Sequence, residues 1–157
     1  MCSNILLNSK LNETISPSEF LNLVISKSTN KIITLLILGR VNINVRDCSG
    51  KNALYWAMIN EDYELIKALI KYKIDLKVSK NLNALNFAVY LDNPKLLKTL
   101  CDCGLDIDCY DEINSTPLIY AILYNKKRAI NFLILKGANQ EHEDFMGNCP
   151  KNLLKRA

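Results

Sequence analysis

The chain has 157 residues, 49% of them hydrophobic, which is enough for a continuous core in a single domain and excludes a largely disordered chain. Its formal net charge of +4 comes from 20 Lys and Arg residues interspersed with 16 Asp and Glu residues, and this mild excess does not by itself indicate a nucleic-acid partner. Because residues 1–7 lack the positive start of a signal peptide and no segment reaches the ~18 apolar residues of a membrane span, we expect a soluble protein in the cytoplasm, or in the host-cell cytosol if its source is a pathogen.

The first clear helix start lies at residue 16. Ser16-Pro17-Ser18-Glu19 provides a capping serine, a proline at the first helical position and a glutamate three residues after the cap, which is typical of a helix N-terminus. Apolar residues from Ile32 to Ile37 recur at helical spacing and predict a second helix with one face turned inward. Residues 1–15 are expected to add a short covering helix.

This pair of helices recurs along the chain. Each copy contains an anchor leucine, at Leu21, Leu54, Leu85 and Leu118. The intervals are 33, 31 and 33 residues, and a fixed period in this range predicts a stacked solenoid. Three residues after each leucine comes a small or β-branched side chain, at Val24, Ala57, Ala88 and Ala121. The short middle interval predicts a truncated or bent turn at residues 79–81; a neutral variation in length is the favoured interpretation, and a shaped partner site is the alternative.

The helices of one repeat cannot be stable by themselves. Isolated helices shorter than ~12–15 residues are marginal in water, so each pair must be buried against the next. Asn93-Pro94 and Thr116-Pro117 repeat the arrangement of a cap followed by proline. Residues 144–157 begin a fifth repeat with Lys151 in the place of the anchor leucine, and we expect them to form a polar C-terminal cap.

The repeat resembles the ankyrin repeat over roughly residues 16–150. The motifs that carry the resemblance are Thr116-Pro117-Leu118, the openers Asp47-Cys48-Ser49-Gly50 and Asp144-Phe145-Met146-Gly147, and the closing Gly137-Ala138-Asn139. The resemblance implies an all-α fold, an ankyrin-repeat solenoid of stacked helix-turn-helix units with β-turn fingers. The expected organisation is a single domain, 1–157, with an N-terminal cap (1–15), repeats at about 16–46, 47–79, 80–110 and 111–143, and a partial C-terminal capping repeat (144–157).

The chain departs from the family pattern at several positions, which we expect to weaken individual turns. Tyr55, Asn86 and Ile119 stand in place of the usual histidine. Asn52-Ala53 and Asn83-Ala84 replace Thr-Pro, and Arg40 and Lys73 stand where the glycine that ends a helix is usual.

Catalytic and metal-binding residues are scarce. The single histidine, His142, lies in a segment that forms an exposed finger in the family, so we do not expect an enzyme. Cys101, Cys103 and Cys109 are close in sequence, but their spacing differs from the Cys pairs of structural zinc sites. We therefore expect no metal, no cofactor and no small-molecule substrate.

The resemblance implies that the inner helices and finger tips form a concave face that binds a partner. Large apolar side chains recur there and have the composition of a protein-binding hot spot. The candidate partner-binding residues are Ile59, Tyr90, Leu91, Ile113, Leu123, Tyr124, Phe145 and Met146. The alternative is that Tyr90 and Leu123 pack against neighbouring fingers or the C-terminal cap. Trp56 is expected to be a partly buried part of the scaffold.

The predicted function is a non-catalytic protein–protein interaction module that works as a stoichiometric inhibitor, an immunity protein or an adaptor. Its partner would be another protein of unknown identity, and we expect a monomer when it is free. The first alternative is association with nucleic acid through a basic surface, made of Lys126, Lys127, Arg128, Lys151, Lys155 and Arg156. The second alternative, an enzyme, would have to use His142 or a cysteine.

Overall fold

The computed structural model describes residues 14–155, so the covering helix expected within residues 1–15 and the side chain of Arg156 lie outside the described part. The chain divides into two compact units, Met1–Lys80 and Asn81–Ala157. The division falls in the turn where the short interval between Leu54 and Leu85 predicts a truncation. The single-domain organisation stays a prediction.

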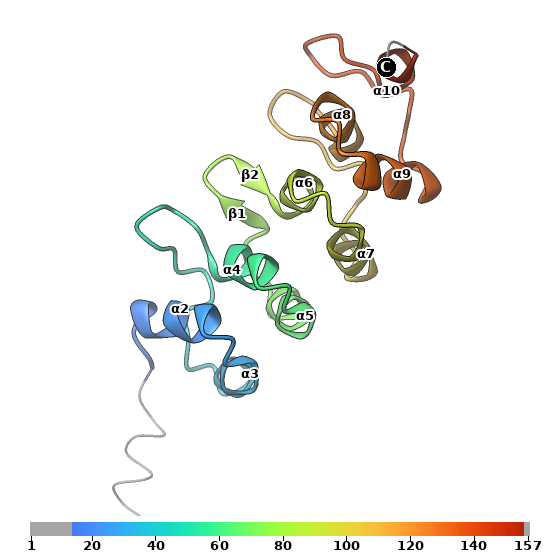
Figure 1. Cartoon of the computed structure of the whole chain (residues 1–157). Helices are drawn as coiled ribbons and strands as arrows, with labels where there is room; N and C mark the ends of the chain where they lie inside the picture. Colours follow the sequence, from blue (N-terminus) through green and yellow to red (C-terminus); the bar gives the residue numbers. More distant parts are fainter. Residues whose placement is uncertain (1–13, 156–157) are drawn as a thin grey trace, which may run out of the picture. The chain divides into compact units, whose positions relative to one another are not determined.

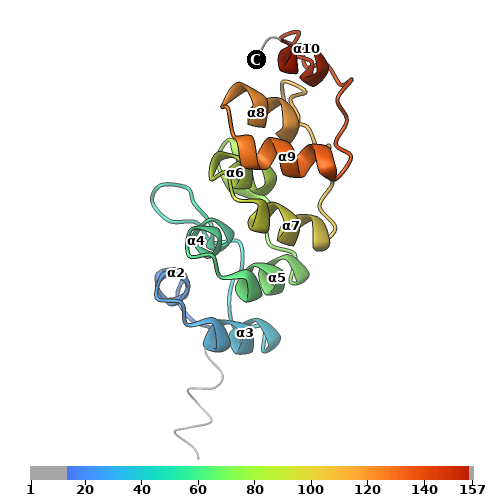
Figure 2. The ribbon, with the colours of Figure 1, turned by 45° about the vertical axis from the view of Figure 1, so that its right-hand side comes forward.

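The first unit consists of two helix pairs and a short strand. Its elements are α2 (Pro17–Ile25), α3 (Thr29–Ile37), α4 (Ala53–Ile59), α5 (Tyr63–Lys71) and β1 (Lys77–Ser79). The helix α2 packs against α3 and α4, and α5 packs against α3 and α4 (Figures 1 and 2). Each pair is an antiparallel hairpin, so the second pair stacks on the first helix by helix.

The second unit repeats this arrangement and ends with a single short helix. Its elements are β2 (Leu82–Asn83), α6 (Ala84–Tyr90), α7 (Pro94–Asp102), α8 (Pro117–Leu123), α9 (Lys127–Leu135) and α10 (Pro150–Leu154). The helix α8 packs between α6 and α10, and α9 packs against α7 and α8. Figure 1 shows the inner helices α6 and α8 between the loops on one side, which we call fingers, and the outer helices α7 and α9 on the other.

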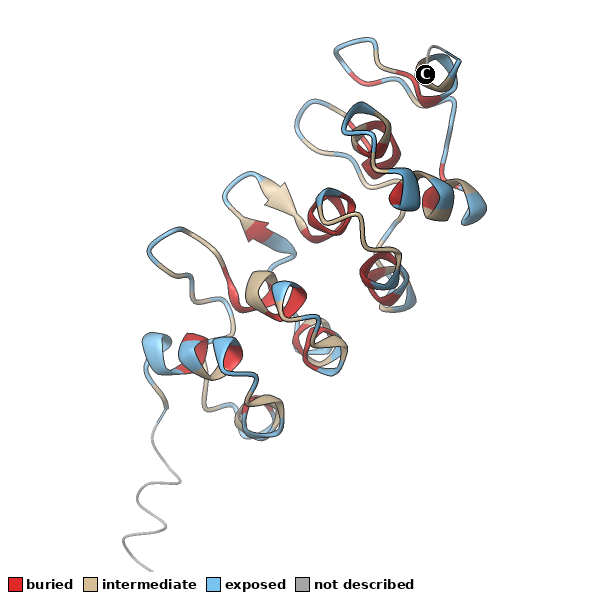
Figure 3. Cartoon of the chain, in the orientation of Figure 1, coloured by how far each residue is buried: buried red, intermediate tan, exposed pale blue. Residues whose placement is uncertain are grey.

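The core of each unit lies between successive helix pairs, as the repeat spacing predicts. Leu54 and Leu118 are fully buried and Leu85 is 2% exposed. Buried residues lie on the helix faces that turn toward the neighbouring pair (Figure 3). Ala57 and Ala88 are also fully buried, because closely packed helices leave no room for a larger side chain. The all-α stacked fold predicted from the sequence is confirmed.

Two asparagines preserve helix starts that we expected to be weakened. The Asn52 side chain accepts a hydrogen bond from the backbone N–H of Tyr55 (3.1 Å), and Asn83 accepts one from Asn86 (2.7 Å). The amide oxygen therefore replaces the hydroxyl of Thr116, which caps α8. Asparagine is as good an N-cap as threonine, so these departures from the family pattern leave the caps in place.

Two other expectations need correction. The glycine that ends the first outer helix is present as Gly39 (φ +63°), one residue before Arg40, so Arg40 replaces nothing. Lys73, in contrast, does adopt the left-handed conformation, with φ +64°. Ile37 was expected on the inward face of α3 but is 64% exposed, since it is the last residue of that helix.

No helix within residues 14–155 is long and apolar enough to cross a membrane.

Candidate protein-binding surface

The fingers of the second unit are shaped by aspartates that bind their own backbone. Asp111 Oδ1 accepts hydrogen bonds from the N–H groups of Ile113 (3.1 Å) and Ser115 (3.0 Å). Asp144 holds the next finger in the same way, and its Oδ1 accepts from Met146 (2.9 Å). This side-chain bonding stabilises a turn without a sheet partner. The finger tips are therefore fixed by the chain itself.

Asp144 is the most strongly held of these carboxylates. Its side chain is buried, and burial by itself raises its pKa. Hydrogen bonds from the Ser115 hydroxyl, from Asn148 and from the Met146 backbone outweigh that effect and lower the pKa to about 2. The charged form is thus favoured because it is the acceptor of every one of these bonds.

The last two fingers of the chain are joined along their backbones. The Phe145 N–H donates to the Ile113 carbonyl (3.1 Å), and the Asn114 side chain donates to the Glu143 carbonyl (3.2 Å). These bonds place the tips of the two fingers side by side. The tip residues Ile113, Phe145 and Met146 are 42%, 76% and 72% exposed, and we call them the tip cluster.

A second set of exposed apolar side chains lies at the C-terminal ends of the inner helices. Tyr90 ends α6, Leu123 ends α8 and Tyr124 follows it. Their exposed fractions are 60%, 48% and 57%, so neither Tyr90 nor Leu123 is covered by a neighbouring finger or by α10. We call these three residues the helix cluster. The Lys126 ammonium lies 5.1 Å from the centroid of the Tyr90 ring, in cation–π contact.

Tyr120 connects the two clusters. Its ring stacks on Tyr124 at a centroid distance of 5.8 Å, and its hydroxyl donates to Asp111 Oδ2 (2.5 Å). Burial, together with this bond to Asp111, raises the pKa of Tyr120 to about 12. The finger that carries Ile113 is thereby tied to the helix that carries Tyr124.

The first unit repeats this link with a different aromatic residue. Trp56 Nε1 donates to Asp47 Oδ2 (3.0 Å), again across nine residues. Trp56 is half-buried, and this contact belongs to the scaffold. Ile59 ends α4 and is 43% exposed, and it belongs to the first unit, whereas the other candidate residues belong to the second.

The remaining candidate, Leu91, is less exposed than the residues of the two clusters, and the structure adds an exposed aromatic residue that the sequence did not indicate. Leu91 is the C-cap of α6 and is half-buried. Tyr110, one residue before Asp111, is 67% exposed and stacks on His142 with ring centroids 6.3 Å apart. Its position in the repeat is not an apolar one, so periodicity carries no signal for it.

Several residues named for the alternative functions make contacts within the fold. His142 Nε2 lies 2.7 Å from the Asn114 carbonyl, so one ring nitrogen is used to join the fingers. Burial raises the pKa of the Cys109 thiol to about 11, which disfavours the thiolate that binds zinc. Within residues 14–155 no group of three or more His, Cys, Asp or Glu side chains is placed to hold a metal ion. Among the basic residues, Lys151 forms an ion pair with Glu141 (2.7 Å).

Comparison with known proteins agrees with this architecture. A family model described as ankyrin repeats (3 copies) matches residues 21–111 and 78–144. An ankyrin repeat protein of Acanthamoeba polyphaga mimivirus, L371, is 28% identical over 126 residues, covering 78% of this chain and 16% of its own length. The potassium channel AKT2/3 of Arabidopsis thaliana is 28% identical over 149 residues, with 89% and 18% covered. Ankyrin repeat protein FPV223 of fowlpox virus is 24% identical over 106 residues, with 68% and 75% covered. The chain thus spans less than a fifth of the first two relatives.

Proposed function

Because the chain belongs to the ankyrin-repeat family, we propose that it is a non-catalytic module that binds another protein through the tip cluster and the helix cluster of its second unit. Ankyrin repeats are protein-interaction modules, and the family is generally non-catalytic. What supports this surface in particular is the exposure of six large apolar side chains on a frame of internally bonded aspartates.

The physical basis is preorganisation. Binding loses affinity when side chains and loops must be ordered in the complex. Here the fingers are held by Asp111 and Asp144 and joined through the Phe145–Ile113 backbone bond. Large, stiff aromatic side chains on such a frame gain burial at a small cost in conformational entropy.

The module would act by covering a surface of its partner or by tethering it. We propose that it is a monomer when free, that it works in the cytoplasm, and that it serves as a stoichiometric inhibitor, immunity protein or adaptor. These roles share one requirement, a rigid face that binds without a chemical step. An interface of about 800 Å² on each partner would be sufficient.

Site-specific photo-crosslinking in the source cell tests the surface. A photoreactive phenylalanine analogue replaces Phe145 in one version of the full chain and Asn131, an exposed residue of the outer helix α9, in the control version. We expect a discrete crosslinked product from position 145 that is absent from position 131. A product from both positions alike, or from position 131 only, would contradict this assignment.

A further inference from the structure

Basic and acidic residues are interspersed along the sequence as a whole, but the charged residues in the finger loops of the second unit are all acidic. The loop from 103 to 116 contains Asp106, Asp108, Asp111 and Glu112 and no Lys or Arg. The loop from 137 to 149 contains Glu141, Glu143 and Asp144, again without Lys or Arg. Every Lys and Arg of the second unit therefore lies outside these two loops, which form its two long fingers.

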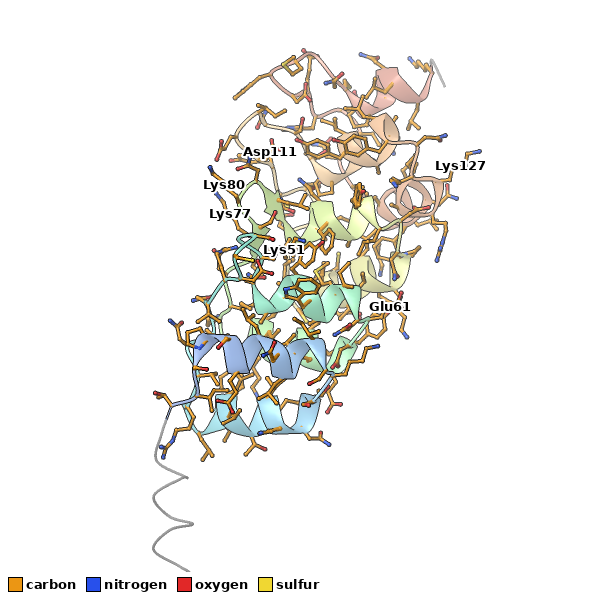
Figure 4. The ribbon with its side chains drawn as sticks, turned by 60° about the vertical axis from the view of Figure 1, so that its left-hand side comes forward. Lys51, Glu61, Lys77, Lys80, Asp111 and Lys127 are labelled. Carbon is orange, nitrogen blue, oxygen red and sulfur yellow. The ribbon has the colours of Figure 1, made fainter. Side chains whose placement is uncertain are left out.

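The first unit has the opposite arrangement. Its finger segments, 38–52 and 72–80, each carry three basic residues and one aspartate. Figure 4 shows Lys51, Lys77 and Lys80 on the finger side of this unit and Glu61 away from them. In the second unit, Asp111 lies on the finger side and Lys127 on the opposite side of the inner helix (Figure 4).

The negative fingers of the second unit carry exposed apolar side chains. Ile113 follows Glu112 directly, and Phe145 lies two residues after Glu143. Both glutamates are exposed, whereas the carboxylate of Asp144 is buried. Glu141 forms an exposed ion pair with Lys151. The two loops together hold seven carboxylates and no Lys or Arg, next to exposed apolar tips, and this charge balance favours a positively charged partner.

We propose that the partner binds the tip cluster with a basic polypeptide segment, in which an apolar side chain is flanked by Lys or Arg. This inference rests on the proposed function and names the chemical class of its partner. Complementary charges at the rim of an interface select the partner and speed association, while the buried apolar anchor supplies the affinity. The same carboxylates repel the phosphates of a nucleic acid, which makes a nucleic-acid partner at this edge unfavourable.

Two synthetic peptides test the class of partner. Both contain the same leucine and phenylalanine anchors; one has Lys and Arg at all other positions, and the second has Glu there. Binding to the full ¹⁵N-labelled chain is measured by NMR titration. We expect the basic peptide to shift the amide resonances of Ile113 and Phe145. Its affinity should fall as salt rises from ~0.01 M to ~1 M, where the screening length drops from about 30 Å to about 3 Å.

Charge-neutral variants test the carboxylates themselves. We expect the combination of Glu112→Gln and Glu143→Gln to weaken binding of the basic peptide about threefold to tenfold. The control, Glu64→Gln, makes the same change at an exposed residue of the outer helix α5 and should leave the affinity within about twofold. Gln has nearly the shape of Glu, so these changes test charge and not packing.

The outcomes separate this inference from the proposed function. Equal binding of the acidic peptide, no shift at the fingers, or equal losses from the combined Glu112→Gln, Glu143→Gln variant and from Glu64→Gln would overturn the assignment of a basic partner. If the crosslink from position 145 still forms in that case, the surface binds a protein of another charge class. If the crosslink also fails, the surface itself is wrongly assigned.

Discussion

The hydroxyl of Tyr120 donates a hydrogen bond to Asp111 across nine residues of sequence, and the same spacing joins Trp56 to Asp47 in the first unit. In both cases an aromatic residue of an inner helix holds the carboxylate that shapes the adjacent finger. This hydrogen bond fixes the position of the finger relative to the inner helix. The finger is therefore held rigidly against the stacked helices.

Replacing Tyr120 by Phe tests this link. The variant keeps the stacked ring but removes the donor to a charged carboxylate, so we expect a loss of about 1 to 2 kcal/mol in the free energy of unfolding. Urea denaturation followed by circular dichroism measures it. Tyr124→Phe is the matched control because its ring is exposed, and it should change stability by less than about 0.5 kcal/mol. Equal effects of the two changes would show that the bond to Asp111 contributes nothing.

Asp144 predicts an acid-sensitive finger. Its pKa in the folded chain, about 2, lies below its ordinary value of 3.8, so the stabilising contribution is complete above about pH 4 and is lost as the pH falls toward 2. Allowing for solvent screening, we expect about 1 kcal/mol of pH-dependent stability in this window that is absent from Asp144→Asn. The urea midpoint of unfolding is measured between pH 2 and pH 5 for the wild type and for Asp144→Asn. If the midpoints of the two proteins change with pH in parallel, Asp144 makes no such contribution.

Lys73 occupies a backbone conformation that favours glycine. Its φ of +64° brings its Cβ close to the carbonyl oxygen that follows, whereas Gly104 stands at the corresponding position of the next repeat. We expect Lys73→Gly to raise the free energy of unfolding by about 0.5 to 1 kcal/mol. The reciprocal change, Gly104→Lys, should lower it by a similar amount. Stabilisation by both changes, or by neither, would be inconsistent with this account.

Asn86 has a buried oxygen without a hydrogen-bond partner among residues 14–155. The side chain is 7% exposed, and its Oδ1 accepts no bond from any described group. An unsatisfied buried acceptor costs about 1 to 3 kcal/mol, so we expect Asn86→Leu, a change of similar shape, to stabilise the chain by about 1 kcal/mol. Ile119 is buried at the matching position of the next repeat. Thermal unfolding measures the change, with Asn22→Leu on the exposed face of α2 as the control.

The helix cluster predicts a loss of partner binding without a loss of fold. Tyr90→Ala combined with Tyr124→Ala removes two exposed rings, one of which stacks on Tyr120, so each change should lower the free energy of unfolding by no more than about 1.5 kcal/mol. Retention of the partner in a pull-down should fall at least tenfold if both rings are interface anchors. Wild type and Asn131→Ala are compared with it in the same extract. A partner retained equally by all three proteins would exclude the helix cluster from the interface.

The repeat was predictable because its signals are local and periodic. The anchor leucines, the small residues after them and the cap-then-proline pairs each report burial or backbone geometry of one short segment. Even the substitution of Thr by Asn52 could be judged from chemistry, since either side chain can cap a helix. In contrast, Ile37 was placed on the wrong side, because the end of a helix is not covered by the next pair.

The sequence by itself determined the register of the stacked helices and the residues that fill their core, because burial repeats with the period of the chain. Only the tertiary structure decided which groups meet across that period. The bond from Tyr120 to Asp111 and the joining of Phe145 to Ile113 both depend on how the chain folds back on itself. Such contacts join residues of different segments, and the spacing of residues along the chain does not show which segments come close together in the fold.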